Sequence, residues 1–429
     1  MRRTVPPSLT VCPGCAAEGP ADRIACERCG DLVEVRHGAS LPPGHRLREL
    51  FSARRGARSV ANRSGVWRFR ELIHPGLAES AIVSLAEGRT PLFRHPRLAA
   101  YAGVPDLAFK HEGMNPTGSF KDRGMTVGAS EARRAGARAV ACASTGNTSA
   151  SLAAYAAAAG MAAVVLVPEG KIAPGKLAQT VAYGARVLKV PGSFDDAMRF
   201  VEEAAPALGL RLLNSVNPWR IEGQKAIALE LLEDLSWRPP DWIALPAGNL
   251  GNTSALGKAL REALAAGLID RLPRVAAVQA AGAAPFFRLV REGGAALVPE
   301  PRPETAASAI RIGNPRSWRK ALAVLRETDG VVTAATDEEI LDAKAEIDRA
   351  GVGCEPASAA ALAGVKRLRA EGTIGARESV VCILTGHVLK DPDAVVKYHE
   401  GAARLANQPR EAPRDIDGLR DLLAREIGE

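Results

Sequence analysis

The sequence is poor in aromatic residues and has no long apolar run. Phe, Trp and Tyr together make up 4% of its 429 residues, while alanine and glycine are abundant. This composition suits closely packed α/β layers. No stretch approaches the roughly 20 apolar residues of a membrane-spanning helix, and the N-terminus lacks the apolar segment of a signal peptide. We therefore expect no membrane partner, and we expect the cytoplasm as the compartment.

Cysteines are also few, and their arrangement is not that of a secreted disulfide framework. Four of the seven form two CxxC pairs, Cys12 with Cys15 and Cys26 with Cys29, separated by ten residues (positions 16–25). Two thiolate pairs at this spacing suit tetrahedral zinc, which small ribbons use in place of a core. Four sulfur ligands leave no open position, so we expect a structural zinc site. A ribbon that keeps its cysteines without metal is the alternative.

Charge gives no strong sign of a polyanionic partner. Lys and Arg number 56 against 48 Asp and Glu, a formal charge of +8. The arginines are scattered, and no basic run is interleaved with aromatic residues, so we expect no nucleic-acid partner. A small phosphorylated substrate accounts for local positive charge equally well.

The chain has room for two or three domains. Residues 1–35 are predicted to form the ribbon, and residues 36–80, rich in Arg, Gly and Pro, a linker or arm. From residue 81 to about 400, apolar strand-like runs alternate with Ala-rich helical stretches, and residues 401–429 end in a polar amphipathic helix. The expected strands are 139–143, 163–167, 186–190, 211–213, 242–245, 275–279 and 380–384. Continuous apolar strands between amphipathic helices indicate parallel sheets covered on both faces.

The segment KHEGMNPTGSFKDRGM places Lys121 between a turn-rich stretch and an expected helix. Asn-Pro and Thr-Gly are turn formers, and the charged run behind them opens the helix. A lysine at such a junction suits a Schiff-base nucleophile, because burial and nearby positive dipoles lower its pKa. A solvated surface lysine is the alternative when the segment is taken alone.

Two loops between an expected strand and helix have the composition of anion sites. Residues 144–149 read STGNTS, and hydroxyls, an amide and free N–H groups at a helix N-terminus can hold a carboxylate or phosphate. Residues 248–253 read GNLGNT, whose paired glycines let the backbone approach a single phosphate closely. The second loop is neither a dinucleotide GxGxxG motif nor a P-loop, because no Lys-Ser/Thr follows.

Two further segments follow expected strands. Thr385 lies directly after the strand 380–384, where its hydroxyl can bond a ring nitrogen, and His387 invites either an acid–base or a structural role. In NSVNPWR, Asn217 is a plausible N-cap with Pro218 at the first helical position. Arg220 then falls in the first turn, where it can meet a dianion; a surface arginine is the alternative.

These motifs together resemble a known family. They are NPTGSFKDRGM around Lys121, ASTGNTSAS around Asn147, NSVNPWRIEGQK around Arg220, PAGNLGN around Gly248, RIGNP at Arg311, CEPASAAALAG at Cys354 and TGHVLKDP at Thr385. From Ile82 to Tyr398 the chain resembles the threonine synthases, pyridoxal-phosphate enzymes of fold type II, the tryptophan-synthase-like fold. The resemblance implies a two-lobed α/β fold with parallel-rich sheets flanked by helices, plus the four-cysteine ribbon that some members carry. A smaller mobile lobe of about residues 117–213 and a homodimer are also implied.

The resemblance assigns roles to individual residues. Lys121 would hold pyridoxal 5'-phosphate as an internal aldimine and then act as the mobile base. Asn147 would bond the phenolic oxygen of the cofactor, and Thr385 would face its pyridine nitrogen. The cofactor phosphate would lie on Gly248, Asn249, Leu250, Gly251 and Asn252. The substrate would be bound by Ser144, Thr145, Gly146, Thr148, Asn214, Ser215 and Arg220, and zinc by Cys12, Cys15, Cys26 and Cys29.

The implied reaction converts O-phospho-L-homoserine and water into L-threonine and phosphate. Rivals on the same fold are a dehydratase for serine or threonine and a cysteate-synthase-like enzyme acting on phosphoserine. A dehydratase has no use for the phosphate pocket of Asn214, Ser215 and Arg220. Phosphoserine differs by one methylene, which is worth only about 1–3 kcal/mol. A non-catalytic, ribbon-bearing binding protein is disfavoured by Lys121. The family usually has glycine where Val388 stands, and a positive φ there would strain valine.

Overall fold

The computed structural model describes residues 8–169, 174–192, 194–401 and 403–427. The chain divides into two compact units, Met1–Asp391 and Pro392–Glu429. The first unit holds three sheets, and the second consists of α16 (Pro392–Glu400) and α17 (Ile416–Ile427). Among the described residues, no helix combines the length and the apolar character required to cross a bilayer.

A small antiparallel sheet begins the described chain. Its strand order is β2-β1-β3, with β1 (Leu9–Val11), β2 (Glu18–Gly19) and β3 (Glu34–Arg36). The two CxxC turns lie in the connections of this sheet, and its buried apolar cluster contains only Cys12, Cys26 and Val33. We call residues 8–37 the ribbon. So small a core cannot stabilise three short strands alone, and other contacts must hold the ribbon.

Short helices follow the ribbon in the segment where the sequence shows only weak periodicity. They are α1 (Gly44–Arg55), α2 (Val60–Arg63), η1 (Trp67–Phe69), α3 (Arg70–Ile73) and η2 (Glu79–Ala81). Leu47, Phe51, Trp67 and Phe69 are fully buried and belong to the main apolar cluster of the first unit. This segment therefore packs as part of the core.

The larger sheet has six strands in the order β12-β11-β10-β13-β5-β4. Its strands are β4 (Leu92–Phe93), β5 (Leu107–His111), β10 (Trp242–Pro246), β11 (Arg274–Ala280), β12 (Val331–Ala335) and β13 (Val380–Leu384). All neighbours pair in parallel except the short edge strand β4, which runs antiparallel to β5. Because β10 and β13 are central and buried on both faces, they are continuous apolar runs, as the sequence predicted.

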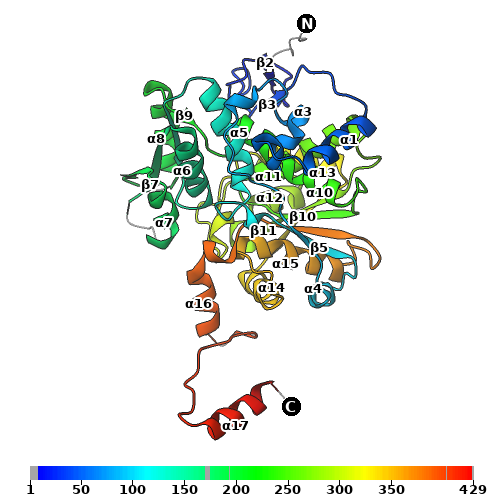
Figure 1. Ribbon diagram of the computed structural model, residues 1–429, viewed down its shortest axis with the longest axis vertical. Helices are drawn as coiled ribbons and strands as arrows, with labels where there is room; N and C mark the ends of the chain where they lie inside the picture. Colours follow the sequence, from blue (N-terminus) through cyan, green and yellow to red (C-terminus); the bar gives the residue numbers. More distant parts are fainter. Residues whose placement is uncertain (1–7, 170–173, 193, 402, 428–429) are drawn as a thin grey trace. The chain divides into compact units, whose positions relative to one another are not determined.

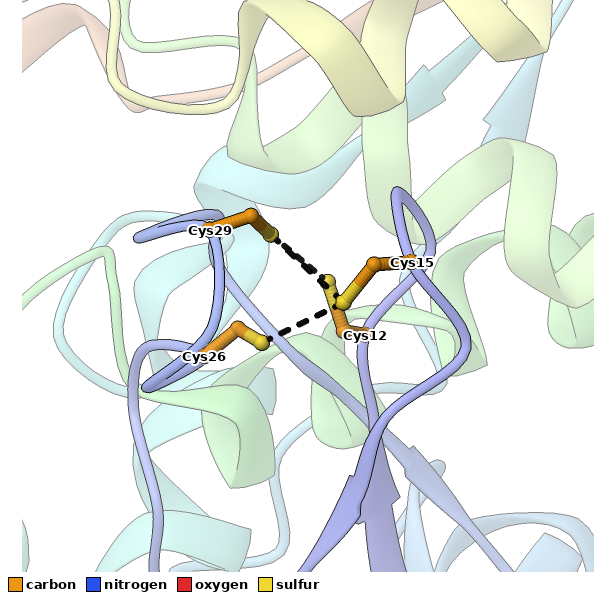
Figure 2. Close-up of side chains that lie close together, drawn as sticks. All are labelled: Cys12, Cys15, Cys26 and Cys29. Atoms are coloured by element: carbon orange, nitrogen blue, oxygen red, sulfur yellow. Dashed lines mark hydrogen bonds between the residues drawn. The ribbon is translucent and has the colours of Figure 1, made fainter.

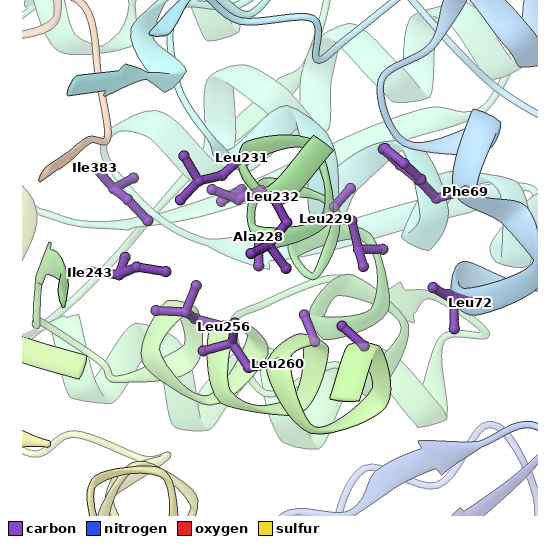
Figure 3. Packing of buried hydrophobic residues seen from close by; sticks show 14 of the residues in the cluster. Phe69, Leu72, Ala228, Leu229, Leu231, Leu232, Ile243, Leu256, Leu260 and Ile383 are labelled. Carbon is purple, nitrogen blue, oxygen red and sulfur yellow. The ribbon is translucent and has the colours of Figure 1, made fainter. Parts of the chain in front are cut away.

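Helices cover both faces of this sheet. One face packs on α4 (Pro96–Ala102), α14 (Asp337–Arg349) and α15 (Pro356–Ala370). The other packs on α10 (Ala226–Asp234), α11 (Gly251–Ala265), α12 (Pro285–Glu292) and α13 (Trp318–Glu327). Figure 3 shows Ile243 and Ile383 of the sheet facing Leu256 and Leu260 of α11 and the leucines of α10. Each such fully buried side chain contributes about 1.5–3 kcal/mol, so this layer is the stable base of the fold.

The smaller sheet has four parallel strands in the order β8-β7-β6-β9. They are β6 (Ala139–Ala143), β7 (Ala162–Pro168), β8 (Arg186–Val190) and β9 (Arg211–Leu212). The helices of this lobe are α5 (Lys121–Arg134), α6 (Asn147–Ala159), α7 (Pro174–Ala182), α8 (Phe194–Ala207) and α9 (Pro218–Gln224). Figure 1 shows α6, α7 and α8 gathered around it, beside the larger sheet. All seven strands predicted from the sequence are present, so the α/β class is confirmed.

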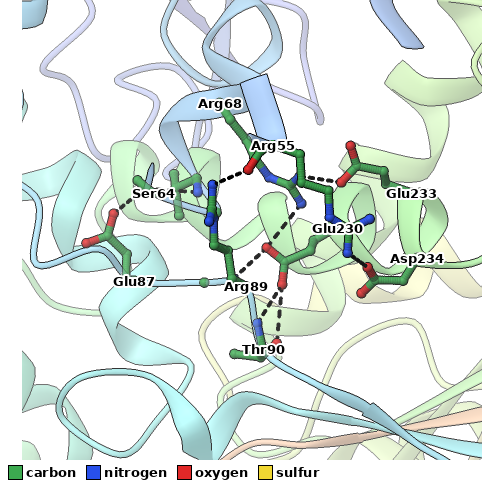
Figure 4. Close-up of polar contacts among 12 residues, drawn as sticks. Arg55, Ser64, Arg68, Glu87, Arg89, Thr90, Glu230, Glu233 and Asp234 are labelled. Atoms are coloured by element: carbon green, nitrogen blue, oxygen red, sulfur yellow. Dashed lines mark hydrogen bonds and ion pairs between the residues drawn. The ribbon is translucent and has the colours of Figure 1, made fainter. Parts of the chain in front are cut away.

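A buried ion cluster joins the helices after the ribbon to the larger sheet. Glu230 of α10 accepts hydrogen bonds from Lys110 Nζ and Arg123 Nη2, both at 2.8 Å. It also accepts from the backbone N–H of Thr90 at 2.9 Å and pairs with Arg68, as Figure 4 shows for the last two. Because every charge here has a partner, the cluster avoids the large cost of an isolated buried ion.

Candidate active site

Lys121 is the first residue of α5 and lies beside the end of β13. The lysine loop (residues 115–120) precedes it and turns at Gly118, whose φ of +84° favours glycine. Phe120 N–H donates to the Thr385 carbonyl at 2.9 Å, and Ser119 forms a bridge with Gly386. The loop is thus paired with the chain that leaves β13, which places Lys121 at the carboxyl edge of the larger sheet. Ligands bind at this edge in α/β proteins.

The next residue, Asp122, holds the lysine loop in shape. Its buried carboxylate accepts from the Thr117 N–H at 2.7 Å and from the hydroxyls of Thr117 and Ser151, each at 2.6 Å. Burial raises the pKa of Asp122 to about 6. Since α6 supplies Ser151, this carboxylate also ties α5 to the helix that carries Asn147.

The surroundings of Lys121 favour its neutral form. Loss of hydration and the positive charge of Arg220 lower the pKa of Lys121, Glu355 opposes both, and the result is a pKa of about 7. Lys121 Nζ lies 4.1 Å from the centre of the Phe120 ring. A lysine that is half deprotonated near neutral pH can act as a nucleophile or base without a strong base beside it.

Glu355 bonds the side chains of two predicted site residues, although no role was predicted for it from the sequence. Its Oε2 accepts from Asn147 Nδ2 at 2.9 Å, and its Oε1 accepts from the Thr385 hydroxyl at 3.3 Å. A side chain at Gly386 would lie 2.4 Å from the carboxyl carbon, so only glycine leaves room for it. Burial raises the pKa of Glu355. The available signal was its position before Pro356, where it caps the start of α15.

The loop before α6 presents the second group of predicted residues. Ser144, Thr145, Gly146, Asn147 and Thr148 are all half-buried at the helix N-terminus. The hydrogen bonds of the described side chains here include those of the Ser144 hydroxyl with Gly146 N–H, of the Ser149 hydroxyl with the Gly146 carbonyl, and of Asn147 with Glu355. The first turn of α6 thus retains unpaired N–H groups, which suit an anion.

The glycine loop (residues 248–252) leads from β10 into α11. Leu250 adopts a left-handed φ of +63° at the N-cap of α11. The side-chain nitrogen of Asn252 and the hydroxyl of Thr253 are buried and have no hydrogen-bond partner among the described residues. Two polar groups left unmatched at a helix N-terminus fit a phosphate that is bound there.

Of the three residues of the predicted phosphate pocket, Asn214 and Ser215 lie in the connection between β9 and α9, and Arg220 lies in the first turn of α9. We call these three residues the Arg220 pocket. The side chain of Asn214 pairs with both the N–H and the carbonyl of Ala143, at 3.1 and 3.0 Å. The Ser215 hydroxyl accepts from Asn249 of the glycine loop at 2.5 Å. The pocket thus adjoins both β6 and the glycine loop.

Arg220 itself is fully buried and mostly unmatched. Its Nη1 donates to the Leu213 carbonyl at 3.1 Å, while Nε and Nη2 have no partner among the described residues. Burial lowers the pKa of Arg220 to about 10. A buried cation without an acid beside it is costly, so the geometry suits an anionic ligand at this position.

The four cysteines of the ribbon come together as the spacing predicts (Figure 2). Their sulfur atoms all lie within 4.8 Å of one another, with Cys12 to Cys29 at 3.4 Å and Cys15 to Cys26 at 3.5 Å. Tetrahedral zinc with bonds of about 2.3 Å separates its ligands by roughly 3.8 Å. The four-sulfur donor set therefore fits zinc.

The chain after Thr385 contains His387 and Val388, for which the sequence left alternatives open. The His387 ring accepts from the Leu389 N–H at 3.2 Å, which is the structural role considered for it. Val388 opens the short helix η6 (Val388–Lys390) and does not have a positive φ, so valine is unstrained there. Lys390, which sequence reasoning missed, donates to Gln179 of α7 at 2.6 Å. It connects the larger lobe to the smaller one.

Comparisons with known proteins agree with this geometry. Residues 83–386 match the family described as pyridoxal-phosphate dependent enzyme. The threonine synthase of Methanosarcina acetivorans is 44% identical over 416 residues, covering 96% of this chain and 98% of the relative. That of Methanocaldococcus jannaschii is 46% identical over 400 residues, covering 92% and 96%.

Solved structures support the fold alone. The processed form of threonine deaminase isoform 2 from Solanum lycopersicum aligns with a TM-score of 0.62 at 22% identity, covering 73% of this chain and 88% of that one. Maize serine racemase aligns with a TM-score of 0.62 at 21% identity, covering 79% and 98%. The expected fold type II and the resemblance seen in the sequence are confirmed, and the chain belongs to the threonine synthase family of pyridoxal-phosphate-dependent enzymes.

Proposed function

We propose that this site converts O-phospho-L-homoserine and water into L-threonine and inorganic phosphate. The observation that carries the proposal is Arg220, a fully buried guanidinium with two unmatched nitrogens, whose charge acts on Lys121. A substrate whose phosphate lies at Arg220 brings its reacting carbons toward the lysine. Neutral hydroxy amino acids would leave this cation unpaired.

Pyridoxal 5'-phosphate supplies an electron sink for carbon acids when it is bound. We assign its phosphate to the glycine loop at the N-terminus of α11, where Asn252 Nδ2 has no acceptor among the described residues. Asn147 is assigned to the phenolic oxygen and Thr385 to the pyridine nitrogen. Glu355 bonds both of these side chains and would fix their orientation.

Lys121 is assigned the proton transfers. With a pKa of about 7, Lys121 can remove the Cα proton of the substrate near neutral pH. It then transfers protons at Cβ and Cγ, while phosphate leaves Cγ and water adds at Cβ. The Phe120 ring, whose centre lies 4.1 Å from Lys121 Nζ, borders the amine on one side. Orientation of one base toward neighbouring carbons is the contribution that the chain itself makes.

The substrate is assigned to two groups of residues. Ser144, Thr145, Gly146 and Thr148 would bind the carboxylate through the N-terminus of α6. Arg220 and Ser215 would bind the phosphate, while Asn214 would hold the pocket against the end of β6, since its amide already pairs with Ala143. Lys390, which bonds Gln179 across the lobes, would act when the smaller lobe of about residues 117–213 closes.

The deciding experiment is paired quantification of threonine and phosphate from the cofactor-loaded enzyme. O-phospho-L-homoserine is given in one reaction and phosphoserine in a parallel one. Equal release of threonine and phosphate from the first substrate alone supports the proposal. Turnover of phosphoserine or of a hydroxy amino acid, without threonine, would overturn the substrate assignment and keep the cofactor site.

We further propose a cytoplasmic homodimer. Four reduced thiols at one metal site suit a reducing compartment, and dimerisation is the habit of the family. Analytical ultracentrifugation of the cofactor-loaded enzyme tests the second point, and a monomer at micromolar concentration would refute it.

A further inference from the structure

The ribbon lies directly against α9, the helix that carries Arg220. Trp219 Nε1 donates to the carbonyl of Ala21, in the loop between the two CxxC pairs, at 2.9 Å. Three residues further along α9, Glu222 pairs with His37 at the end of the ribbon, at 2.9 Å. Residues three apart share one helix face, so this face of α9 belongs to the ribbon.

Both contacts are buried and surrounded by rigid groups. Trp219 is 3% exposed, and its ring stacks on His74 at 4.2 Å between centroids. Glu222 is fully buried, and Lys225 and Lys258 hold its pKa well below the usual range. Lys258 also donates to the carbonyl of Val35 in β3. Loss of the ribbon would leave Trp219 Nε1 without its acceptor and would remove one partner each from Glu222 and Lys258. The ribbon and α9 are therefore positioned together.

A neighbouring face of α9 meets α5, and no side chain separates the two backbones at Gly223 and Gly124. A Cβ on Gly223 would lie 1.9 Å from the Arg123 carbonyl oxygen, and one on Gly124 would lie 2.8 Å from the Arg220 carbonyl oxygen. The Arg220 side chain runs beside Gly128 of α5. A displacement of α9 therefore moves Arg220 relative to the helix that begins at Lys121.

The ribbon has little apolar core of its own, as its cluster of Cys12, Cys26 and Val33 shows. A four-sulfur metal site is what gives a unit of this size a fixed shape. A metal bound at the cysteines would therefore influence the position of α9, because Ala21 and His37 of the ribbon contact that helix.

We propose that the metal-loaded ribbon is a positioning element of the Arg220 pocket. Zinc held by Cys12, Cys15, Cys26 and Cys29 fixes the ribbon, and the ribbon fixes Arg220 through Trp219 and Glu222. The inference rests on the proposed role of Arg220 in binding phosphate. It makes Trp219 and Glu222 positioning residues for the substrate, although neither faces it.

The test measures the dissociation constant of inorganic phosphate by calorimetry on cofactor-loaded enzyme, together with its zinc content by mass spectrometry. Trp219→Phe keeps the stacking on His74 and removes the donor to Ala21. Zinc depletion by a chelator, followed by readdition of zinc ions, perturbs the connection from the ribbon to Arg220 without a substitution. Arg319→Ala is the matched control, because it removes a ribbon contact, with Asp31 at 2.9 Å, that does not involve α9.

We expect about one zinc ion per chain, and a dissociation constant for phosphate raised about tenfold by Trp219→Phe and by zinc depletion. Zinc readdition restores the depleted enzyme, and Arg319→Ala changes the constant less than twofold. KM for O-phospho-L-homoserine should rise in parallel, with kcat and the visible absorbance of the cofactor nearly unchanged.

Phosphate binding that is unchanged in the depleted enzyme and in Trp219→Phe overturns the inference. So does a protein that neither contains nor takes up zinc, and so does a parallel loss of cofactor absorbance, which marks a general stability role. An enzyme that binds phosphate at Arg220 but makes no threonine refutes the proposed reaction and leaves this inference intact.

Discussion

Arg220→Met should weaken phosphate binding and stabilise the phosphate-free enzyme at the same time. Methionine replaces the guanidinium with a flexible apolar side chain that can fill the space beside Gly128 and Leu213. The substitution removes two buried nitrogens that have no partner among the described residues. A buried unmatched donor costs about 1–3 kcal/mol, and the smaller side chain forfeits part of that gain as lost packing.

The net gain in unfolding free energy should be about 1 kcal/mol, which raises the melting temperature by roughly 1 °C in phosphate-free buffer. The affinity for phosphate should fall. Two charge-assisted hydrogen bonds to a phosphate are worth about 3–4 kcal/mol together, a factor of roughly 10² to 10³ in affinity. KM for O-phospho-L-homoserine should rise by that factor, with kcat changed much less.

Melting curves of the cofactor-loaded enzyme, with and without inorganic phosphate, test both the expected gain in stability and the expected loss of phosphate binding. Wild type should gain stability from phosphate by mass action, and Arg220→Met should not. A variant that melts several degrees below wild type without phosphate would refute the reasoning, because the guanidinium would then be well paired inside the protein. Unchanged kinetics would remove Arg220 from the substrate site.

Three other perturbations test the site and its support. Lys121→Ala should abolish turnover and the visible absorbance of the bound cofactor. In wild type at saturating substrate, kcat should fall about tenfold per pH unit below about pH 7, since the released Lys121 amine is neutral only above its lowered pKa; a flat profile would exclude Lys121 as the base. Glu355→Ala should weaken cofactor binding about tenfold in equilibrium dialysis, and Glu355→Gln, which keeps an acceptor, much less. Glu230→Gln should destabilise the fold by about 3–5 kcal/mol in urea unfolding, because Lys110 and Arg123 lose their buried partner.

The sequence predicted most strands of the two parallel sheets, but it missed β5 and β12. All seven predicted strands form, yet β5 was missed, because Lys110 and His111 interrupt its apolar pattern. Those side chains are tolerated inside because Lys110 meets Glu230 and His111 meets the carbonyl of Gly353 at 2.7 Å. Such partners are distant in sequence and leave no local pattern. The strand β12 lies at a sheet edge and has the same length as β10 and β13, and it was missed because Thr333 interrupts its short apolar run.

The same reason limits the prediction of the site. Motifs gave Lys121 and the three loops because each of these is a local strand–loop–helix pattern. Glu355 escaped notice because its role depends on Asn147, about 200 residues away. The contact of Trp219 with Ala21 spans a similar separation. No spacing rule within one segment can reveal such pairs.

The backbone contact between α9 and α5 has a consequence for substrate length. Because Gly223 lies against the Arg123 carbonyl, the spacing between the two helices has no flexible side chain that can absorb a change. Phosphohomoserine and phosphoserine differ by about one carbon–carbon bond, roughly 1.5 Å. We infer that the spacing of these helices sets the distance between the Lys121 amine, at the start of α5, and the substrate phosphate at Arg220 of α9. Gly223→Ala must push the two helices apart. We expect it to change the ratio of kcat/KM for the two compounds more than it changes cofactor binding. An unaltered ratio would show that the spacing of α9 and α5 does not select substrate length.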